Sequence, residues 1–219
     1  MLKGIIFDLD GTLLNTLADI TASLNLTLKK YGAEEVDEET VRLRVGNGSR
    51  VLVERSLPHL TAAAIDEALA DYKQNYAQHF KDQSYAYPGI KELIKQLAAA
   101  GIKIGVNTNK FEEMAKELVK KHFSEINTEL VLGQIKGRAD KPSPQAAEEL
   151  LKKMGLSKAE VLFVGDSATD IQTGKNAGLK TVGVAWGYRG IKVLKENAAD
   201  VIIEEAQQLA DYIKGENAC

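Results

Sequence analysis

The chain has 219 residues, of which 44% are hydrophobic and 27% charged, and its formal net charge is -3 at pH 7. This length fits one globular core with an insert, and the charge balance provides no basic surface for nucleic acid or anionic lipid. The sequence lacks both an apolar run of about 20 residues and a signal-peptide pattern, so we predict a cytoplasmic protein with no membrane partner. The single cysteine, Cys219, excludes an internal disulfide and a thiolate metal site.

Short apolar runs alternate with helical segments along most of the chain. The predicted strands are 3–7, 102–106, 130–132, 161–164, 181–184 and 201–203. The predicted helices between them are 88–100, 111–121, 143–154 and 171–177, the third with Ser143 as its N-cap and Pro144 at its first position. Strands that are apolar nearly throughout are typical of a parallel sheet buried on both faces. The pattern therefore predicts an α/β fold with a Rossmann-like open parallel sheet.

One segment interrupts this alternation, because residues 17–80 contain helical patterns and no convincing strand. One helical face is marked by Leu17, Ile20, Leu24 and Leu28, and further helices are expected at 38–44, 49–57 and 62–80. About 60 helical residues are too many for an ordinary connection between strands. We predict a catalytic core of 1–14 and 82–219 and an all-helical cap domain of 15–81. The alternative is that these helices simply pack on the sheet.

Two aspartates follow the first predicted strand. Asp8 and Asp10 stand two residues apart, and in an extended strand such residues face the same side. Two like charges this close are costly unless a cation or a shared proton relieves them. The pair therefore favours a metal ion or acid/base chemistry. The alternative is an acidic turn that caps the next helix.

Three further polar segments also follow predicted strands. These are 107–110, 140–144 and 165–170. In open α/β sheets, ligands bind at the carboxyl ends of strands, where the strand order reverses. We therefore expect these segments to meet Asp8 and Asp10 at one edge of the sheet.

At these residues the chain resembles the haloacid-dehalogenase (HAD) superfamily. The four matching motifs are Phe7-Asp8-Leu9-Asp10-Gly11-Thr12-Leu13, Thr108, Lys141-Pro142, and Gly165-Asp166-Ser167 with Asp170. Within that superfamily, segments 46–48, 87–89, 108–110 and 186–188 resemble most the phosphoglycolate phosphatases. Asn15 and Asn107 depart from the usual pattern of those relatives.

The resemblance implies phosphoryl transfer through an aspartyl phosphate. Asp8 would be the nucleophile and Asp10 the general acid and base. Thr108 and Lys141 would complete the catalytic set and bind the transferring phosphoryl group. A Mg²⁺ cofactor would be bound by Asp8, the backbone carbonyl of Asp10 and Asp166.

Several of these residues have ordinary structural alternatives. In the metal site, Asp170 would act through water or a neighbouring ligand, but Asp166 and Asp170 could equally be a capped helix start. Thr108 could be a helix cap and Lys141 a surface lysine.

Substrate binding is expected to involve three further residues. Asn109 follows Thr108 in the core, whereas Asn47 and Arg50 lie in the predicted cap, where a loop with Gly46 and Gly48 could bind a small carboxylate. The alternative for this cap loop is a plain turn between helices with a solvated arginine.

These inferences predict an Mg²⁺-dependent phosphatase acting on a small phosphorylated metabolite, with 2-phosphoglycolate as the best single substrate. The protein would be a monomer or homodimer and would bind no nucleic acid. Alternatives are a phosphatase for pyrophosphate or a sugar phosphate, and a phosphomutase of the same fold. A dehalogenase is disfavoured by the presence of Asp10, and an inactive binding module by the complete catalytic set.

Overall fold

The computed structural model describes residues 1–218, so Cys219 lies outside the described part of the chain. The chain forms two compact units, one of Met1–Leu14 with Ala86–Cys219 and one of Asn15–Tyr85. We call these the sheet unit and the helical unit.

A parallel sheet forms the centre of the sheet unit. Its strands are β1 (Gly4–Phe7), β4 (Lys103–Phe111), β5 (Val131–Gln134), β6 (Val161–Gly165), β7 (Lys180–Val184) and β8 (Val201–Ile203). The order is β5-β4-β1-β6-β7-β8, and every described pair is parallel. The chain adds β4 and β5 on one side of β1 and then returns to add β6 on the other side. The strand order therefore reverses at β1, where a ligand site is expected.

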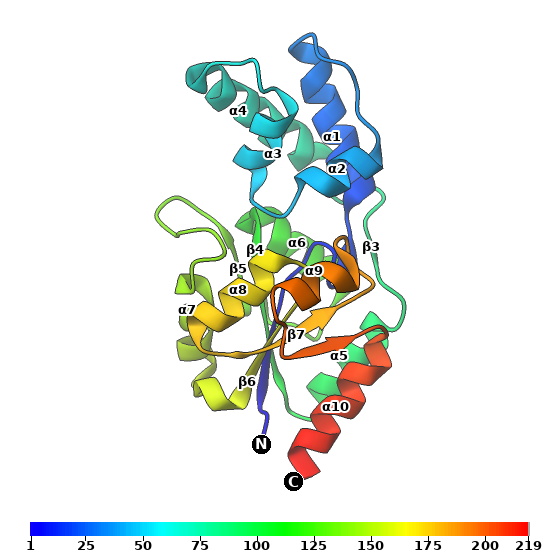
Figure 1. Cartoon of the computed structure of the whole chain (residues 1–219), viewed down its shortest axis with the longest axis vertical. Helices are drawn as coiled ribbons and strands as arrows, with labels where there is room; N and C mark the ends of the chain where they lie inside the picture. The colour runs from blue at the N-terminus through cyan, green and yellow to red at the C-terminus, as the bar shows by residue number, and fades with distance from the viewer. Residues whose placement is uncertain (219) are drawn as a thin grey trace. The chain divides into compact units, whose positions relative to one another are not determined.

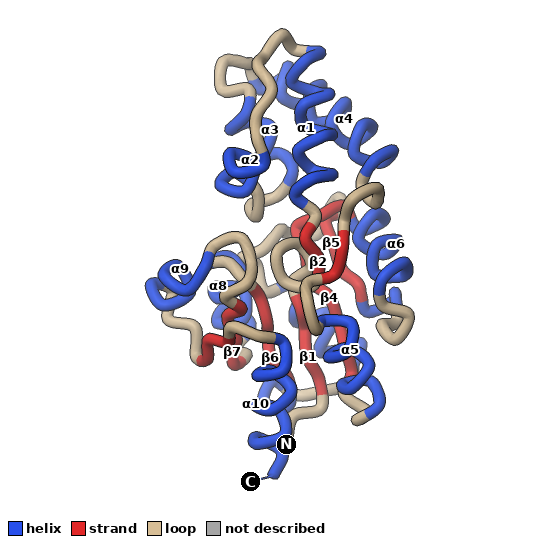
Figure 2. The backbone as a smooth tube through the Cα atoms, turned by 90° about the vertical axis from the view of Figure 1, so that its right-hand side faces the viewer, coloured by secondary structure: helices blue, strands red, loops and turns tan. Residues whose placement is uncertain are grey.

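Helices flank both faces of this sheet (Figures 1 and 2). They are α5 (Ile90–Ala99), α6 (Glu112–His122), α7 (Gln145–Met154), α8 (Ala168–Ala177), α9 (Gly190–Glu196) and α10 (Ala206–Ala218), with short 3-10 turns at Thr128–Leu130 and Lys158–Glu160. Helix α5 packs with α10 on one face, and α7 packs with α8 on the other. The apolar stripe of α7 contributes Leu150 and Met154 to a core that includes Ile6 and Phe163. The predicted α/β fold is confirmed.

Several predicted boundaries were wrong. Strand β4 continues to Phe111 instead of ending at Val106, so Thr108, Asn109 and Lys110 belong to the strand. Helix α7 starts at Gln145, with Pro144 as its N-cap. Helix α8 already starts at Ala168, because the Ser167 side chain caps it. Helices α9 and α10 were not predicted.

Four helices make up most of the helical unit: α1 (Leu17–Lys30), α2 (Glu38–Arg44), α3 (Ser49–Ser56) and α4 (Ala62–His79). Helix α1 packs along α4, and the Nδ2 atom of Asn75 donates a hydrogen bond to Thr27 Oγ1 between them at 3.0 Å. The short strands β2 (Leu14–Asn15) and β3 (Tyr85–Ala86) pair where the two units meet in the sequence. Across residues 1–218, no helix has both the length and the apolar character needed to cross a bilayer.

Candidate active site

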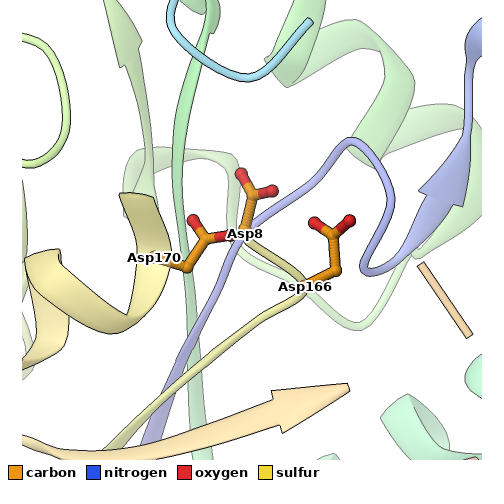
Figure 3. A group of neighbouring side chains, drawn as sticks. All are labelled: Asp8, Asp166 and Asp170. Atoms are coloured by element: carbon orange, nitrogen blue, oxygen red, sulfur yellow. The ribbon is translucent and has the colours of Figure 1, made fainter. Parts of the chain in front are cut away.

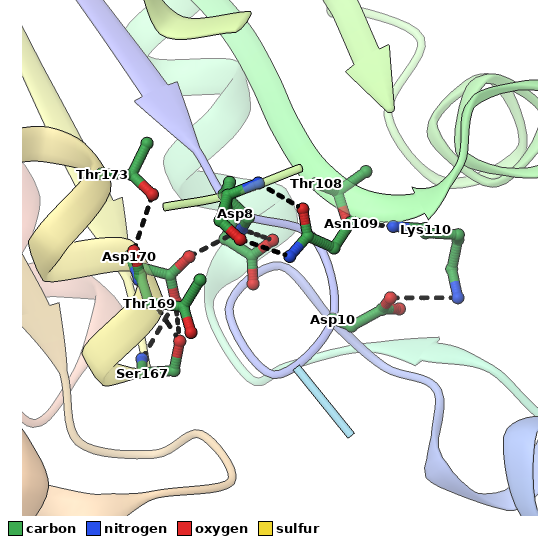
Figure 4. A network of polar contacts seen from close by, with 10 residues as sticks. Asp8, Asp10, Thr108, Asn109, Lys110, Ser167, Thr169, Asp170 and Thr173 are labelled. Atoms are coloured by element: carbon green, nitrogen blue, oxygen red, sulfur yellow. Dashed lines mark hydrogen bonds and ion pairs between the residues drawn. The ribbon is translucent and has the colours of Figure 1, made fainter. Parts of the chain in front are cut away.

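A buried lysine bridges two buried aspartates at the carboxyl edge of the sheet. Lys141 lies in the loop between β5 and α7, and its Nζ atom is 2.6 Å from Asp8 Oδ1 and 2.6 Å from Asp170 Oδ1. Asp8 directly follows β1, and its N–H donates a hydrogen bond to the carbonyl of Val164 in β6. All three side chains are at most 8% exposed. Residues far apart in the sequence thus converge on one ion-paired cluster, shown in part in Figure 4.

Asp170 has two roles, because its two oxygens face different partners. Oδ2 accepts hydrogen bonds from the Ser167 N–H at 3.0 Å and from Ser167 Oγ at 2.6 Å, which completes the capping box of α8. Oδ1 accepts the bond from Lys141. The predicted capped helix start is therefore confirmed for Asp170, and the same capping bonds hold the carboxylate that contacts Lys141.

Asp166 completes a group of three carboxylates, which Figure 3 shows gathered at the ends of β1 and β6 and the start of α8. Oxygen atoms of Asp8, Asp166 and Asp170 lie within 4.8 Å of one another. The N–H of Tyr188 donates a hydrogen bond to Asp166 Oδ2 at 2.7 Å. A Cβ at either Gly11 or Gly187 would overlap the Asp166 side chain, so both glycines are needed for this close packing.

The electrostatics of this group show a shortage of positive charge. Burial raises the pKa of Asp8 to about 7, with Asp170 and Asp10 adding to the shift and Lys141 opposing it. The pKa of Asp166 is also well above its ordinary value, because of burial and then of Asp170 and Asp8, although Tyr188 N–H and Arg189 oppose this. Lys141 is itself buried, yet Asp170 and Asp8 raise its pKa. Three hard oxygen donors in such surroundings fit a divalent cation such as Mg²⁺.

The end of β4 supplies three more buried side chains. The hydroxyl of Thr108 accepts a hydrogen bond from the Lys110 N–H at 3.2 Å. Asn109 contacts the backbone of Lys141, with its Oδ1 accepting from the Lys141 N–H at 2.7 Å and its Nδ2 donating to the Lys141 carbonyl at 3.1 Å. Lys110 Nζ lies 3.0 Å from Asp10 Oδ2 (Figure 4). Lys110 was not among the predicted site residues, although its position two residues after Thr108 was a usable signal.

Asp10 differs from the other predicted metal ligands. Strand β1 ends at Phe7, so Asp8 and Asp10 lie beyond the strand and not within it. Among the described residues, the carboxylate group that could hold a metal contains Asp8, Asp166 and Asp170 and not the Asp10 side chain. The Asp10 carboxylate contacts Lys110 instead. The backbone carbonyl of Asp10 is therefore the one group of this residue that remains as an expected metal ligand.

Asn47 and Arg50 belong to the helical unit, whereas the other predicted site residues belong to the sheet unit. Asn47 is exposed in the short connection between α2 and α3. Arg50 forms ion pairs with Glu54, at 3.0 Å, and with Asp66. Its guanidinium is therefore already engaged by two carboxylates within the helical unit.

Fold and site together define an enzyme with a buried, acidic, metal-compatible centre at the switch point of a parallel sheet. The family model for haloacid dehalogenase-like hydrolases matches residues 5–184. The chain belongs to this family, as its motifs predicted, and it is a hydrolase.

Individual relatives are similar over nearly the whole chain. A phosphoglycolate phosphatase of Photobacterium profundum is 32% identical over 221 residues, which cover 97% of this chain and 96% of the relative. One of Pseudomonas savastanoi pv. phaseolicola is 34% identical, covering 91% of this chain and 76% of the relative. A crystal structure of a provisionally assigned phosphoglycolate phosphatase from Lactobacillus delbrueckii subsp. bulgaricus superimposes with a TM-score of 0.91 at 30% identity, covering 96% of this chain and 98% of that one.

Proposed function

We propose that the chain is an Mg²⁺-dependent phosphatase that hydrolyses a small phosphorylated metabolite through an aspartyl phosphate on Asp8. The observation that carries this proposal is the buried contact of Lys141 with both Asp8 and Asp170, beside the carboxylate of Asp166. The best single substrate is 2-phosphoglycolate, because relatives that match nearly the whole chain are phosphoglycolate phosphatases.

In the first step, a carboxylate oxygen of Asp8 attacks phosphorus and the bond to the leaving oxygen breaks. Asp10 donates a proton to that oxygen, so the product leaves as an alcohol. In the second step, Asp10 takes a proton from the water that attacks the acyl phosphate. Inorganic phosphate leaves and the Asp8 carboxylate is restored.

Lys141 and Thr108 stabilise the transferring group by charge and hydrogen bonding. The ammonium of Lys141 has three protons, of which two point to Asp8 and Asp170, so a third can bind a phosphoryl oxygen. The hydroxyl of Thr108 accepts from a backbone N–H and can donate its own proton to another oxygen. Such preorganised donors supply much of the catalysis of phosphoryl transfer.

Asp8 and Asp166, with the backbone carbonyl of Asp10, would hold the Mg²⁺ ion, and Asp170 would support the site from its contact with Lys141. When bound, the ion neutralises phosphate and carboxylate charge and thereby keeps the nucleophile ionised at neutral pH. The raised pKa values of Asp8 and Asp166 support the requirement for a cation at this site.

The test is phosphate release from a panel of phosphate esters by the purified protein, with Mg²⁺ and with excess chelator. The panel should contain 2-phosphoglycolate, pyrophosphate, sugar phosphates and an aryl phosphate. We expect metal-dependent release with the highest kcat/KM for 2-phosphoglycolate. Interconversion of sugar phosphates without net phosphate release would instead indicate a phosphomutase, and full activity in chelator would refute the metal requirement.

A further inference from the structure

Lys110 is a buried charged residue that the mechanism above does not use. Its side chain is 2% exposed, and its Nζ atom lies 3.0 Å from Oδ2 of Asp10, whose side chain is 21% exposed (Figure 4). Burying an ammonium is costly unless a charged partner compensates it. The pairing therefore places a compensated positive charge directly against the proposed acid and base.

Lys110 lies in β4, and Asp10 lies in the turn that follows the neighbouring strand β1. Phe7, the last residue of β1, pairs in register with Val106 of β4, and beyond this pair the two segments bring Asp10 and Lys110 into contact. Asp10 lies in a tight turn, where Gly11 has a φ of 90° and its N–H donates a hydrogen bond to the Leu14 carbonyl. The backbone of Asp10 is thus fixed, but its side chain still has rotatable bonds.

The base of the Lys110 side chain is fixed in a similar way. Lys110 belongs to β4, and its N–H donates to the hydroxyl of Thr108 at 3.2 Å. A lysine whose backbone is held by the strand can restrain the carboxylate that it contacts. This restraint would limit the directions in which the Asp10 carboxylate can point.

We propose that Lys110 is a positioning residue that holds the Asp10 carboxylate in the orientation needed for proton transfer. The proposal rests on the proposed function, because it assigns Asp10 the two proton transfers described there. Lys110 takes part in no proton transfer: Asp10 gives its proton to the leaving oxygen and regains one from the attacking water.

The test is a double-mutant cycle of Lys110→Met and Asp10→Asn, measured by kcat for p-nitrophenyl phosphate. A displacement of about 1 Å can cost a reaction on the order of 100-fold, so we expect a kcat loss of that order for Lys110→Met and an unchanged KM. If Lys110 acts through Asp10, adding Lys110→Met to Asp10→Asn changes kcat by no more than about twofold. If the kcat losses of the two single variants multiply in the double variant, the proposal is overturned. A raised KM with unchanged kcat in Lys110→Met would also overturn it and would indicate that Lys110 binds the substrate directly.

A second measurement separates positioning from a general structural role. The value of kcat/KM should fall further for an alkyl phosphate than for p-nitrophenyl phosphate, because an alkoxide leaving group needs a proton more. Equal losses for both esters would contradict the proposal. Lys120→Met, an exposed lysine of α6, is the matched control and should leave both values unchanged.

Thermal unfolding shows whether each variant is folded. If Lys110→Met fails to fold, Lys110→Gln, which retains a hydrogen-bond donor, replaces it in the same cycle. If the wild-type protein releases phosphate from no ester on the panel, the proposed function fails. If the wild type is active and the kcat losses of the single variants multiply in the double variant, only the proposed role of Lys110 is refuted.

Discussion

The side-chain amide of Asn109 binds both polar groups of the Lys141 backbone, the N–H at 2.7 Å and the carbonyl at 3.1 Å. Strand β4 therefore fixes the loop from which the Lys141 ammonium reaches Asp8 and Asp170. Ordering a lysine side chain costs up to about 2 kcal/mol of rotamer entropy, so an anchored backbone lowers the number of conformations that must be excluded. Asn109 was predicted to bind substrate, but its amide oxygen and nitrogen are engaged with Lys141.

The first prediction follows from this contact. Asn109→Leu keeps the volume of the side chain but leaves the buried N–H and carbonyl of Lys141 without this partner. We expect a loss of roughly 2 kcal/mol in the free energy of unfolding. Because Lys141 would be misplaced, kcat should fall on the order of 10- to 100-fold. Denaturant unfolding and steady-state kinetics measure the two effects.

Asn107→Leu is the matched control, because Asn107 lies in the same strand and is 2% exposed. Within residues 1–218, its Nδ2 atom has no hydrogen-bond partner. Removing a buried amide nitrogen that has no partner should leave the free energy of unfolding unchanged or raise it by about 1 kcal/mol. Equal losses of stability and of kcat in Asn109→Leu and Asn107→Leu would contradict the assignment of a specific role to Asn109.

The second prediction concerns the nucleophile. Asp8→Asn should lower kcat roughly 10⁴-fold or more, because an amide is a very poor nucleophile. The phosphoenzyme, detected by mass spectrometry after acid quench, should disappear as well. Asp211→Asn, an exposed aspartate of α10, is the control and should remain active. Near-normal activity of Asp8→Asn would show that another residue forms the covalent intermediate.

The third prediction concerns pH and metal binding. The pKa of Asp8 is raised from 3.8 to about 7 in the folded protein, so the folded state binds this proton more tightly than the unfolded state. The stability that this proton provides is present below about pH 4 and is lost as pH rises toward 7. In excess chelator, Tm should therefore fall between pH 5 and pH 7.5.

Added Mg²⁺ should raise Tm more at pH 7.5 than at pH 5, because the ligands must lose their protons to bind the ion. Asp8→Asn removes one of the two carboxyl groups with a raised pKa, so it should weaken the pH dependence of Tm in chelator and reduce the Mg²⁺ effect. A Tm that is independent of Mg²⁺ at both pH values would refute the metal site. The comparison with Asp8→Asn cancels the contributions of titrating groups that do not interact with Asp8, such as His122.

The sequence was sufficient to predict the parallel sheet and the convergence of Asp8, Lys141 and Asp170. Apolar strands alternating with helices indicate a parallel sheet, and each polar segment follows one of its strands. Topology alone therefore placed the motifs at one edge. The capping contact of Asp170 was also predictable, since Ser167 and Asp170 have the spacing of a capping box.

The contacts at the end of β4 could not be predicted in the same way. Asn107, Thr108, Asn109 and Lys110 are polar, and polar residues normally indicate the end of a buried strand. Here β4 continues through them because specific partners satisfy Asn109 and Lys110, namely the Lys141 backbone and Asp10. Those partners come from elements distant in the sequence, so local periodicity carries no information about them.

The fourth prediction concerns selection of the substrate by Arg50. If its guanidinium binds the carboxylate of 2-phosphoglycolate, Arg50→Ala should lower kcat/KM for that substrate by an amount equivalent to about 2 kcal/mol, while sparing p-nitrophenyl phosphate. Glu54 and Asp66 compete for the same guanidinium, so Asp66→Asn should act in the opposite direction and raise kcat/KM for 2-phosphoglycolate. Arg55→Ala is the control, because this exposed arginine of α3 donates to the Arg44 carbonyl. Equal changes for both substrates in Arg50→Ala would exclude Arg50 as the residue that recognises the carboxylate.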